Sequence, residues 1–372
     1  MTVRESLKSH KRWVVKVGSA LLTNDGQGLC KSVIKNLAEQ IAFLRKQGIE
    51  VVLVSSGSVA AGVSQVGMSE RPTKVNELQA AAAVGQASLV RHYEDAFHPY
   101  GISIAQVLLT HADIANRERY LNAQSTLTTL LSLGMLSVVN ENDTVATDEI
   151  CFGDNDNLAA LVANLVGAEV LVILTDQNGL YTADPRTNPD AELLHEVDAN
   201  DESLKVMASG GSSVGRGGMI TKLTAAQTAS LSGASTVIAY GRESNILESV
   251  YNGDQIGTLL VAHNRLTSKK QWMAGQIKVS GAVTVDDGAA KILKQPGKSL
   301  LMVGVTGVNG DFQRGELVRC LDSEGVEIAR GLSNYSSDEI DRVKGKPSDE
   351  LFELLGYGGD GELIHCDNLV VI

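Results

Sequence analysis

The sequence predicts an α/β protein in which an open, largely parallel sheet is sandwiched by helices, followed by a small, mostly β domain. Between residues 13 and 239, short runs rich in β-branched residues alternate with helical patterns. These runs are almost continuously apolar, which is typical of parallel strands buried on both faces. A polar, basic stretch, residues 262–272, then leads into strand patterns separated by turns. We therefore expect a first domain at 1–263, which would carry any catalytic site, a linker at 264–274 and a second domain at 275–372.

The individual elements follow one another in regular order. Strands are predicted at 13–17, 51–54, 102–109, 136–139, 170–174 and 236–239, and helices near 31–47, 76–97, 119–133, 156–167 and 219–232. In an open parallel sheet, ligands bind beyond the carboxyl ends of the strands. Functional residues are therefore expected directly after each strand.

Composition narrows the functional classes. The 372 residues are 43% hydrophobic and 20% charged, which suits a globular protein with two domains. A net charge of −12 argues against a general polyanion binder. The four cysteines lack metal-ligand or redox spacing, which fits a reducing cytosol. Since the N-terminus is polar and no apolar run reaches transmembrane length, we expect a cytoplasmic protein without a membrane partner.

Two strand ends near the N-terminus carry candidate site residues. Lys16 lies within an apolar strand, where a lysine is costly without a partner, and Gly18 and Ser19 follow it. The alternative for Lys16 is an edge strand with its ammonium in solvent. The second strand ends in the turn 55–58 and enters an Ala-rich helix, so a ligand there would meet helix-terminal N–H groups. A tight turn with capping serines is the alternative.

The fourth strand runs into a segment dense in carboxylates and amides. A solvated acidic loop is the usual interpretation of such a run. Here, however, the segment joins a buried strand to an apolar helix. Its side chains could cap that helix, position lysines, bind Mg²⁺ that accompanies a nucleotide, or hold the ammonium and carboxylate of an amino acid. The residues are Asn140, Glu141, Asn142, Asp143, Asp148, Glu149, Asp154, Asn155, Asp156 and Asn157.

The fifth strand ends in Thr175 and Asp176, followed by turn signals at Asn178–Gly179 and Asp184–Pro185. The chain therefore leaves the sheet here as a loop. Such a loop would fit a ribose or adenine pocket, or would be a simple connector.

A glycine-rich loop precedes the helix that begins near Met219. Five of the ten residues from 209 to 218 are glycine, so backbone N–H groups can approach an anion closely. Lys222 follows on the first turns of the helix, whose positive end also favours a phosphate. The spacing matches neither the Walker A nor the dinucleotide motif. A flexible surface loop before an ordinary helix is the alternative.

Together these segments resemble the amino-acid kinase family over the whole chain. The most specific matches are VVKVGSALLT, VSSGSVAAG, VNENDTVATDEI, FGDNDNLAALVA, LTDQNGLYTADPR and GRGGMITK. The LYTADP pattern is shared with aspartate and uridylate kinases. The NEND and GDNDN segments together favour the branch that phosphorylates free L-glutamate.

The resemblance implies a role for each matching residue. Lys16 and Lys222 would neutralise the phosphoryl oxygens, held by Asp156. Two departures are Arg216, where many members have threonine, and Cys151, where a charged residue is frequent. The glutamate site would comprise Ser56, Asp143 and Asn155, with Asn140 and Asp154 in its walls. The ATP site would comprise Lys16, Gly18, Ser19, Thr175, Asp176, Arg216, Gly217, Gly218, Met219, Ile220, Thr221 and Lys222.

The chemistry that the resemblance implies agrees with this set of residues. A γ-carboxylate with an ordinary pKa of about 4.3 is ionised at neutral pH and needs no general base. ATP with Mg²⁺ would supply the phosphoryl group, and the product would be γ-glutamyl phosphate. His111 is interpreted as structural or at the surface. The family further implies feedback inhibition by proline, a homo-oligomer, and contact with the next enzyme of proline biosynthesis.

The C-terminal part looks like a PUA domain, a small β fold associated with RNA-modifying enzymes. Residues 275–372 contain 10 Lys+Arg and 16 Asp+Glu, a net charge of −6. Because nucleic-acid affinity depends largely on phosphate neutralisation, we do not expect RNA binding. A regulatory or assembly role is favoured on fold analogy alone.

Two other functions stay open. One is a related kinase that acts on N-acetylglutamate, carbamate or a nucleotide, against which the NEND and GDNDN pair argues. The other is an RNA-binding or sensory protein with an inactive kinase-like domain, which the retained lysines and Asp156 oppose.

Overall fold

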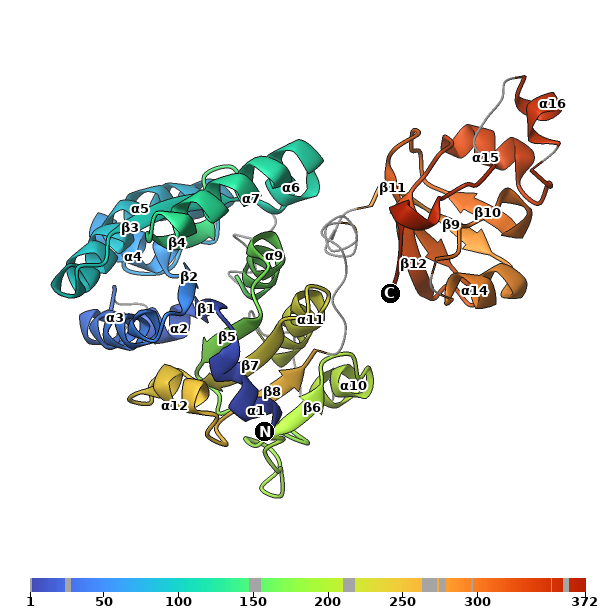
Figure 1. Cartoon of the computed structure of the whole chain (residues 1–372). Coiled ribbons are helices and arrows are strands. Elements are labelled where there is room, and N and C mark those ends of the chain that lie inside the picture. The colour runs from blue at the N-terminus through green and yellow to red at the C-terminus, as the bar shows by residue number, and fades with distance from the viewer. Residues whose placement is uncertain are drawn as a thin grey trace. The chain divides into compact units, whose positions relative to one another are not determined.

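The computed structural model divides into two compact units, residues 1–265 and 266–372 (Figure 1). It describes residues 2–23, 28–146, 155–209, 218–262, 273, 279–295, 297–348, 350–356 and 361–372. The two units are described one at a time below.

The N-terminal unit is built on an eight-stranded sheet with the order β3-β4-β2-β1-β5-β7-β8-β6. All neighbouring strands are parallel except the antiparallel pair β7 and β8. Strand β1 lies between β2 and β5. Strands β2, β4 and β3 extend the sheet on one side of β1, and β5, β7, β8 and β6 extend it on the other. The strands are β1 (Arg12–Val17), β2 (Glu50–Val54), β3 (Ile104–Leu109), β4 (Leu136–Glu141), β5 (Val170–Thr175), β6 (Glu196–Asp198), β7 (Ser235–Tyr240) and β8 (Thr258–Val261).

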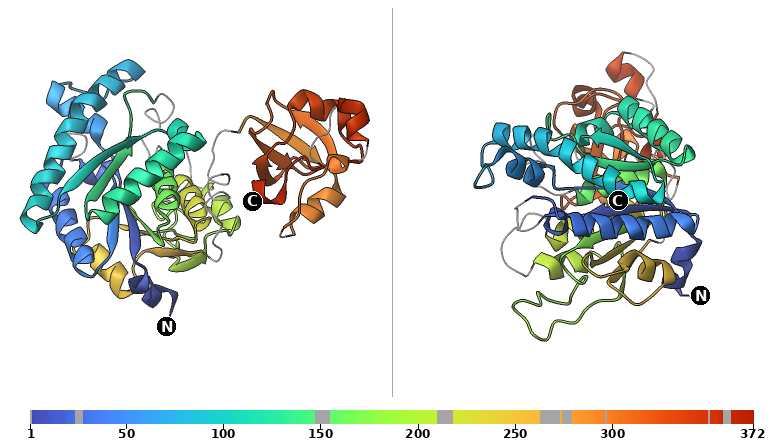
Figure 2. Two further views of the ribbon diagram at one scale, coloured as in Figure 1. Left: turned by 45° about the horizontal axis from the view of Figure 1, so that its top comes forward. Right: turned by 90° about the vertical axis from the view of Figure 1, so that its left-hand side faces the viewer.

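Helices cover both faces of this sheet (Figures 1 and 2). One face packs its apolar side chains against α3 (Lys31–Lys46), α5 (Val75–Phe97) and α12 (Ile246–Asn252). The other face contacts α7 (Arg117–Ser132), α9 (Asp156–Val166) and α11 (Met219–Ser230). The other helices of this unit in the described ranges are α1 (Val3–Ser6), η1 (Leu7–Ser9), α2 (Ser19–Leu22), α4 (Ser58–Val66), η2 (His98–Tyr100), α6 (His111–Ala115) and α10 (Ser203–Ser209).

The alternation of side chains along β1 decides where Lys16 points. Trp13, Val15 and Val17 belong to the core shared with α3 and α12. Because successive side chains in a strand face opposite sides of the sheet, Lys16 points to the side of α9 and α11. Sheet geometry therefore brings this lysine to the start of α9.

Helices α4 and α5 cross with almost no space between their backbones. A Cβ atom on Gly62 would lie 1.7 Å from the carbonyl oxygen of Ala81, and one on Gly85 would lie 1.9 Å from that of Ser58. Only glycine permits this approach. Helix α5 therefore passes directly over the turn that follows β2.

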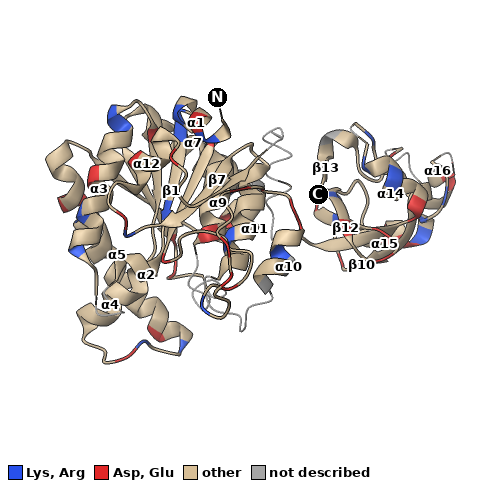
Figure 3. Cartoon of the chain, turned by 90° about the horizontal axis from the view of Figure 1, so that it is seen from below, with Lys and Arg blue, Asp and Glu red and all other residues tan. Residues whose placement is uncertain are grey.

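The C-terminal unit has a five-stranded sheet with the order β10-β9-β11-β12-β13 and its own hydrophobic core. Strands β9 and β11 are parallel and the other pairs are antiparallel. In Figure 3, Lys and Arg are interspersed with Asp and Glu on the described elements of this unit. Its elements are β9 (Gly281–Val285), α14 (Asp287–Leu293), η3 (Met302–Gly304), β10 (Val305–Asn309), β11 (Leu317–Leu321), β12 (Glu327–Leu332), α15 (Ser337–Val343), α16 (Leu351–Leu355), η4 (Cys366–Asn368) and β13 (Leu369–Val371).

The fold class expected from the sequence is confirmed, with some differences in detail. Strands β6 and β8 have only three and four residues, and neither was predicted. Strand β4 extends to Glu141, two residues further than expected, so Asn140 is part of the sheet. The predicted linker, 264–274, lies outside the described residues apart from Met273, and its bounds stay a prediction. None of the described helices combines the length and apolar character needed to cross a membrane.

Candidate active site

A buried cluster of three charges lies where β1, α9 and α11 meet. Lys16 and Lys222 each contact one oxygen of the Asp156 carboxylate: Lys16 Nζ reaches Oδ1, and Lys222 Nζ lies 2.9 Å from Oδ2. The exposed fractions are 4% for Lys16, 5% for Lys222 and zero for Asp156. Two positive charges therefore share one negative charge, which leaves the cluster suited to an anionic group.

The neighbouring lysines control the protonation of Asp156. Burial acts to raise the pKa of this carboxyl, but the charges of Lys16 and Lys222 and their hydrogen bonds outweigh it and hold the pKa well below its usual range. The position of Asp156 in the first turn of α9 also favours the ionised form. Asp156 is thus a fixed anion at neutral pH and a weak base.

The first turn of α11 connects the cluster to the glycine-rich segment. Gly218 is the residue that precedes the helix, and the Thr221 hydroxyl lies 2.7 Å from its carbonyl oxygen and 3.2 Å from Asp156 Oδ2. Met219 and Ile220 open the helix, and the Ile220 side chain is exposed. The N-terminus of α11, with its positive dipole end, is a favourable place for phosphate oxygens.

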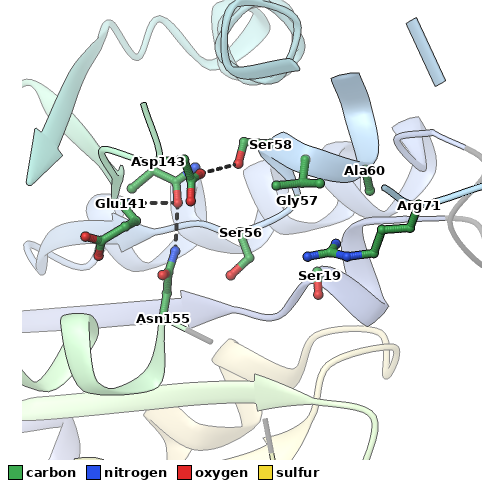
Figure 4. Close-up of a pocket in the computed structure, with 11 residues that line it drawn as sticks. Ser19, Ser56, Gly57, Ser58, Ala60, Arg71, Glu141, Asp143 and Asn155 are labelled. Carbon is green, nitrogen blue, oxygen red and sulfur yellow. Dashed lines mark hydrogen bonds between the residues drawn. The ribbon is translucent and has the colours of Figure 1, made fainter. Parts of the chain in front are cut away.

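A pocket lined mainly by polar residues lies beyond the carboxyl ends of β1, β2 and β4 and is open to solvent. In Figure 4, Asp143 and Asn155 lie on one side of it, and the guanidinium of Arg71, near Ser19, lies on the other. The lining residues are Ser19, Ser56, Gly57, Ser58, Val59, Ala60, Arg71, Asn140, Glu141, Asp143 and Asn155. Asn155 precedes Asp156, and a Cβ on Gly18 would lie 3.7 Å from Lys16 Nζ, so the pocket adjoins the charge cluster.

The serines of the turn after β2 have different environments. Gly57 takes the left-handed conformation, with φ of 94°, and this starts α4 abruptly. Ser58 donates a hydrogen bond to Asp143 Oδ2 at 2.8 Å, which ties the turn to the β4 loop. The hydroxyl of Ser56 is buried and has no hydrogen-bond partner among the described residues. Because buried polar groups are normally satisfied, this hydroxyl in a pocket wall is a candidate ligand-binding group.

Two asparagines of the pocket lining, Asn140 and Asn155, meet in a region that is called the pocket base below. Asn155 Nδ2 donates to Ser55 O at 2.6 Å and to Asn140 Oδ1 at 2.7 Å. Asn140 Nδ2 in turn donates to Gln86 Oε1 of α5 at 2.7 Å. The pocket base is therefore held by side-chain amides, in contrast to the charges of the neighbouring cluster.

The end of β5 carries Thr175 and Asp176. The Thr175 hydroxyl, which is buried, donates to Asp176 Oδ1 at 3.1 Å, and Asp176 is exposed. Thr175 ends β5, the strand next to β1, and Asp176 follows it at the same edge of the sheet as Gly18. The structure thus places these two predicted residues at the edge where the other strand-end residues lie.

Sequence reasoning gave no role to the two charged lining residues Arg71 and Glu141. Arg71 lies in the loop between α4 and α5, and no local sequence signal shows that it turns toward Ser19. Glu141 was noted in the acidic segment without a role, and its buried carboxylate oxygen lies 3.8 Å from His111 Nδ1. His111 is also largely buried, as a structural histidine would be.

Some predicted site residues cannot be placed. Asp154, Arg216 and Gly217 lie outside the described residues, as do Asp148, Glu149 and Cys151. Within the described ranges, no group of three or more His, Cys, Asp or Glu side chains is arranged to hold a metal ion. Mg²⁺ that enters with a nucleotide is bound largely by phosphate oxygens and water, which fits a site of this kind.

Comparison with known proteins identifies the family. The model of the amino acid kinase family matches residues 11–240, and that of the PUA domain matches residues 281–355. The chain therefore belongs to the amino acid kinase family and carries a PUA domain.

Relatives match the chain along its length. The glutamate 5-kinase of Hydrogenovibrio crunogenus is 56% identical over 364 residues, covering 97% of this chain and 96% of its own. That of Paraburkholderia phymatum is 55% identical over 372 residues and all of both chains. Among solved structures, UMP kinase from Bacillus anthracis is 15% identical with a TM-score of 0.48, covering 69% of this chain and 98% of that one.

Proposed function

We propose that this protein transfers the γ-phosphoryl group of ATP to the γ-carboxylate of L-glutamate, giving γ-glutamyl phosphate in the first step of proline biosynthesis. The observation that carries the proposal is a pocket with anionic and cationic sides, next to a buried cluster of two lysines and one aspartate. Its full-length relatives are glutamate 5-kinases. The protein acts in the cytoplasm.

The charges of the pocket suit an amino acid bound in one direction. The carboxylate of Asp143 faces the substrate ammonium, and Ser56 supplies a hydroxyl in the same wall. Arg71, the one cation among the described lining residues, contacts the α-carboxylate. The γ-carboxylate then points toward Lys16, where the cluster adjoins the pocket.

The lysines act on the transferred group. The γ-carboxylate is already ionised at neutral pH and attacks phosphorus without losing a proton. Catalysis therefore consists of alignment and of offsetting charge on the phosphoryl oxygens, which are the tasks of Lys16 and Lys222. Asp156 holds both ammonium groups in place.

ATP occupies the remaining strand ends, with Mg²⁺ bound to its phosphates. The β- and γ-phosphates lie at the first turn of α11, from Gly218 to Lys222, and beside Gly18 and Ser19. Thr175 and Asp176 lie at the edge of the sheet that receives the nucleoside. Mg²⁺ supplies further positive charge to the phosphoryl oxygens when it is bound.

Regulation and assembly follow from the same resemblance. Proline competes with glutamate in or beside the pocket, near the segment from Asn140 to Glu149. The protein forms a homo-oligomer and contacts the next enzyme of the pathway. The PUA domain has a role in regulation or assembly rather than in RNA binding, because its charge is negative.

Trapping of the acyl phosphate tests the function. The full-length protein, incubated with ATP, Mg²⁺, glutamate and hydroxylamine, should form γ-glutamyl hydroxamate. N-acetylglutamate and carbamate serve as competing acceptors. Turnover with either of these, and none with glutamate, would show that the substrate assignment is wrong.

A further inference from the structure

We propose that Gln86, on α5, is a positioning residue of the glutamate site. Through Asn140 it holds the side chain of Asn155 so that the carbonyl oxygen of Asn155, and not its NH₂ group, is available to the substrate. This inference rests on the proposed function, because it concerns how that same site recognises the ammonium of glutamate.

Two backbone groups fix the direction of the amide chain. Asn140 Oδ1 accepts a hydrogen bond from the backbone N–H of Glu141 at 3.0 Å, so this atom must be the oxygen. At the other end, Asn155 Nδ2 donates to the backbone carbonyl of Ser55 at 2.6 Å, so this atom must be the nitrogen. Since a backbone N–H only donates and a carbonyl only accepts, neither amide can be reversed without losing a bond.

Both N–H groups of Asn155 are consequently in use. One bonds to Ser55 O and the other to Asn140 Oδ1. The oxygen Oδ1 is the group of this side chain that remains for a ligand, and it accepts hydrogen bonds only. Asn155 is 8% exposed and lines the pocket, so this acceptor suits an ammonium group.

The local structure supports a role beyond helix capping. Asn155 is the residue that precedes α9, a position where asparagine normally accepts a hydrogen bond from a backbone N–H of the first turn. Its side chain makes no such bond here. The side chain is instead committed to the amide chain, which costs the helix one cap.

Gln86 completes the amide chain from a different element. Asn140 Nδ2 donates to Gln86 Oε1 at 2.7 Å, and Gln86 is itself buried, at 8% exposure. The adjacent Gly85 lets α5 approach the turn at Ser58, and Tyr93 of the same helix bonds to Ser55 Oγ at 2.8 Å. Helix α5 therefore holds the carboxyl ends of β2 and β4 together over the pocket base.

Loss of Gln86 removes the acceptor for Asn140 Nδ2. A buried donor without a partner is unfavourable, so the Asn140 amide will rotate toward another acceptor and release Asn155. In the Gln86→Leu variant, glutamate should bind more weakly, with KM for glutamate rising roughly five- to tenfold. KM for ATP should stay unchanged, because the nucleotide does not contact these amides.

The experiment compares purified full-length variants by hydroxamate formation from glutamate. Gln86→Glu keeps an acceptor oxygen at the same reach and should restore KM for glutamate nearly to the value of the unmodified protein. Gln86→Asn keeps the amide but is one methylene shorter, so it should behave like Gln86→Leu. If Gln86→Leu does not fold, KM for glutamate of Gln86→Asn tests the proposal in its place.

Gln40 provides a matched control on α3. It is also buried, bonds to Asn36 Oδ1 through its amide nitrogen, and accepts a hydrogen bond from Leu247 N at 2.9 Å. Gln40→Leu should lower the melting temperature without changing KM for glutamate. An equal rise of KM in this control would show a general effect of destabilisation and overturn the proposal.

Two other results would overturn it as well. These are an unchanged KM for glutamate in folded Gln86→Leu or Gln86→Asn, and a Gln86→Glu variant as impaired as Gln86→Leu. A failure of the proposed function would look different, because the unmodified protein would then form no hydroxamate from glutamate.

Discussion

The charge cluster and the pocket base lie side by side but are built from different chemistry. The cluster holds three full charges from β1, α9 and α11, buried and paired at hydrogen-bond distance. The pocket base holds neutral amides from α5, β4 and the start of α9. Asn155 and Asp156 are neighbours in sequence, yet each belongs to a different one of these regions.

This difference between charged and neutral groups predicts which step of the reaction each region affects. Charge that faces a transferring phosphoryl group acts mainly in the transition state and so determines kcat. Neutral amides that orient a substrate group act about equally in the ground state and the transition state, and so determine KM. Substitutions in the two regions should therefore separate in steady-state kinetics.

The largest effect is expected in the charge cluster. Lys222→Ala should lower kcat about 100- to 1000-fold with a modest change in KM for glutamate, because one stabilising charge is lost in the transition state. Steady-state kinetics with both substrates measure this. Lys205→Ala, at an exposed lysine on α10, is the control and should retain full activity. A rise in KM with unchanged kcat would show that Lys222 binds the substrate in the ground state and does not act specifically in the transition state.

A smaller effect is expected at the anionic side of the pocket. Asp143→Asn removes the charge that we propose faces the substrate ammonium, and it weakens the bond from Ser58. KM for glutamate should rise about 10- to 100-fold, the range for hydrogen bonds to charged groups. Sensitivity to proline should fall with it. If either property changed while the other stayed intact, glutamate and proline would have separate sites.

The cationic side should be less sensitive, since Arg71 is exposed. Arg71→Ala should raise KM for glutamate about two- to fivefold, because the lost ion pair is partly screened by water. Arg71→Lys keeps the charge without the planar guanidinium group. Its KM for glutamate should lie between those of the unmodified protein and Arg71→Ala. Lys74→Ala removes an exposed cation from the start of α5, where it pairs with Glu77 at 3.2 Å, and is the matched control. Equal rises of KM in Lys74→Ala and Arg71→Ala would indicate that positive charge near the pocket attracts glutamate in general and that Arg71 has no specific contact with it.

The smallest effect on chemistry is expected from removal of the C-terminal unit. The charge cluster and the pocket lie within residues 16–222, and the N-terminal unit has its own core. A chain that ends at Thr267 should phosphorylate glutamate at a comparable rate, with altered assembly or proline inhibition. A folded truncation without kinase activity would show that the PUA domain contributes to the active site.

Much of this arrangement could be predicted from the sequence because its residues directly follow strands. Lys16, Thr175 and the turn at Ser56 stand out as polar or small groups at the ends of apolar runs. The parallel topology brings these ends to one edge of the sheet. Asp156 and Lys222 meet because α9 and α11 cover the face to which Lys16 points.

The contacts that depend on helix crossing could not be predicted. Gln86 lies on a helix face where glutamine gives no local signal, and its role arises from the approach of α5 permitted by Gly62 and Gly85. Arg71 reaches the pocket because of the path of the loop between α4 and α5, which no local pattern in the sequence indicates. The antiparallel strand β8 is too short for its periodicity to be distinctive.

The central claim is that Asp156 positions two lysines and takes no proton from the substrate. The charges of Lys16 and Lys222 hold its pKa below the usual range, so it stays ionised at neutral pH and is a poor base. Its ionised form stabilises the fold above the ordinary carboxylate pKa of about 4, and this contribution is lost as the pH falls through and below that value.

The most direct test is the pH dependence of kcat for Asp156→Asn between about pH 6.5 and 8.5, where an unperturbed carboxylate does not titrate. Melting temperatures recorded at each pH ensure that both proteins are folded. The variant should be slower than the unmodified protein at every pH, because both lysines are released, and the two profiles should run parallel. A steep new rise of the variant's rate with pH would show that hydroxide replaces a lost general base, and would contradict the account.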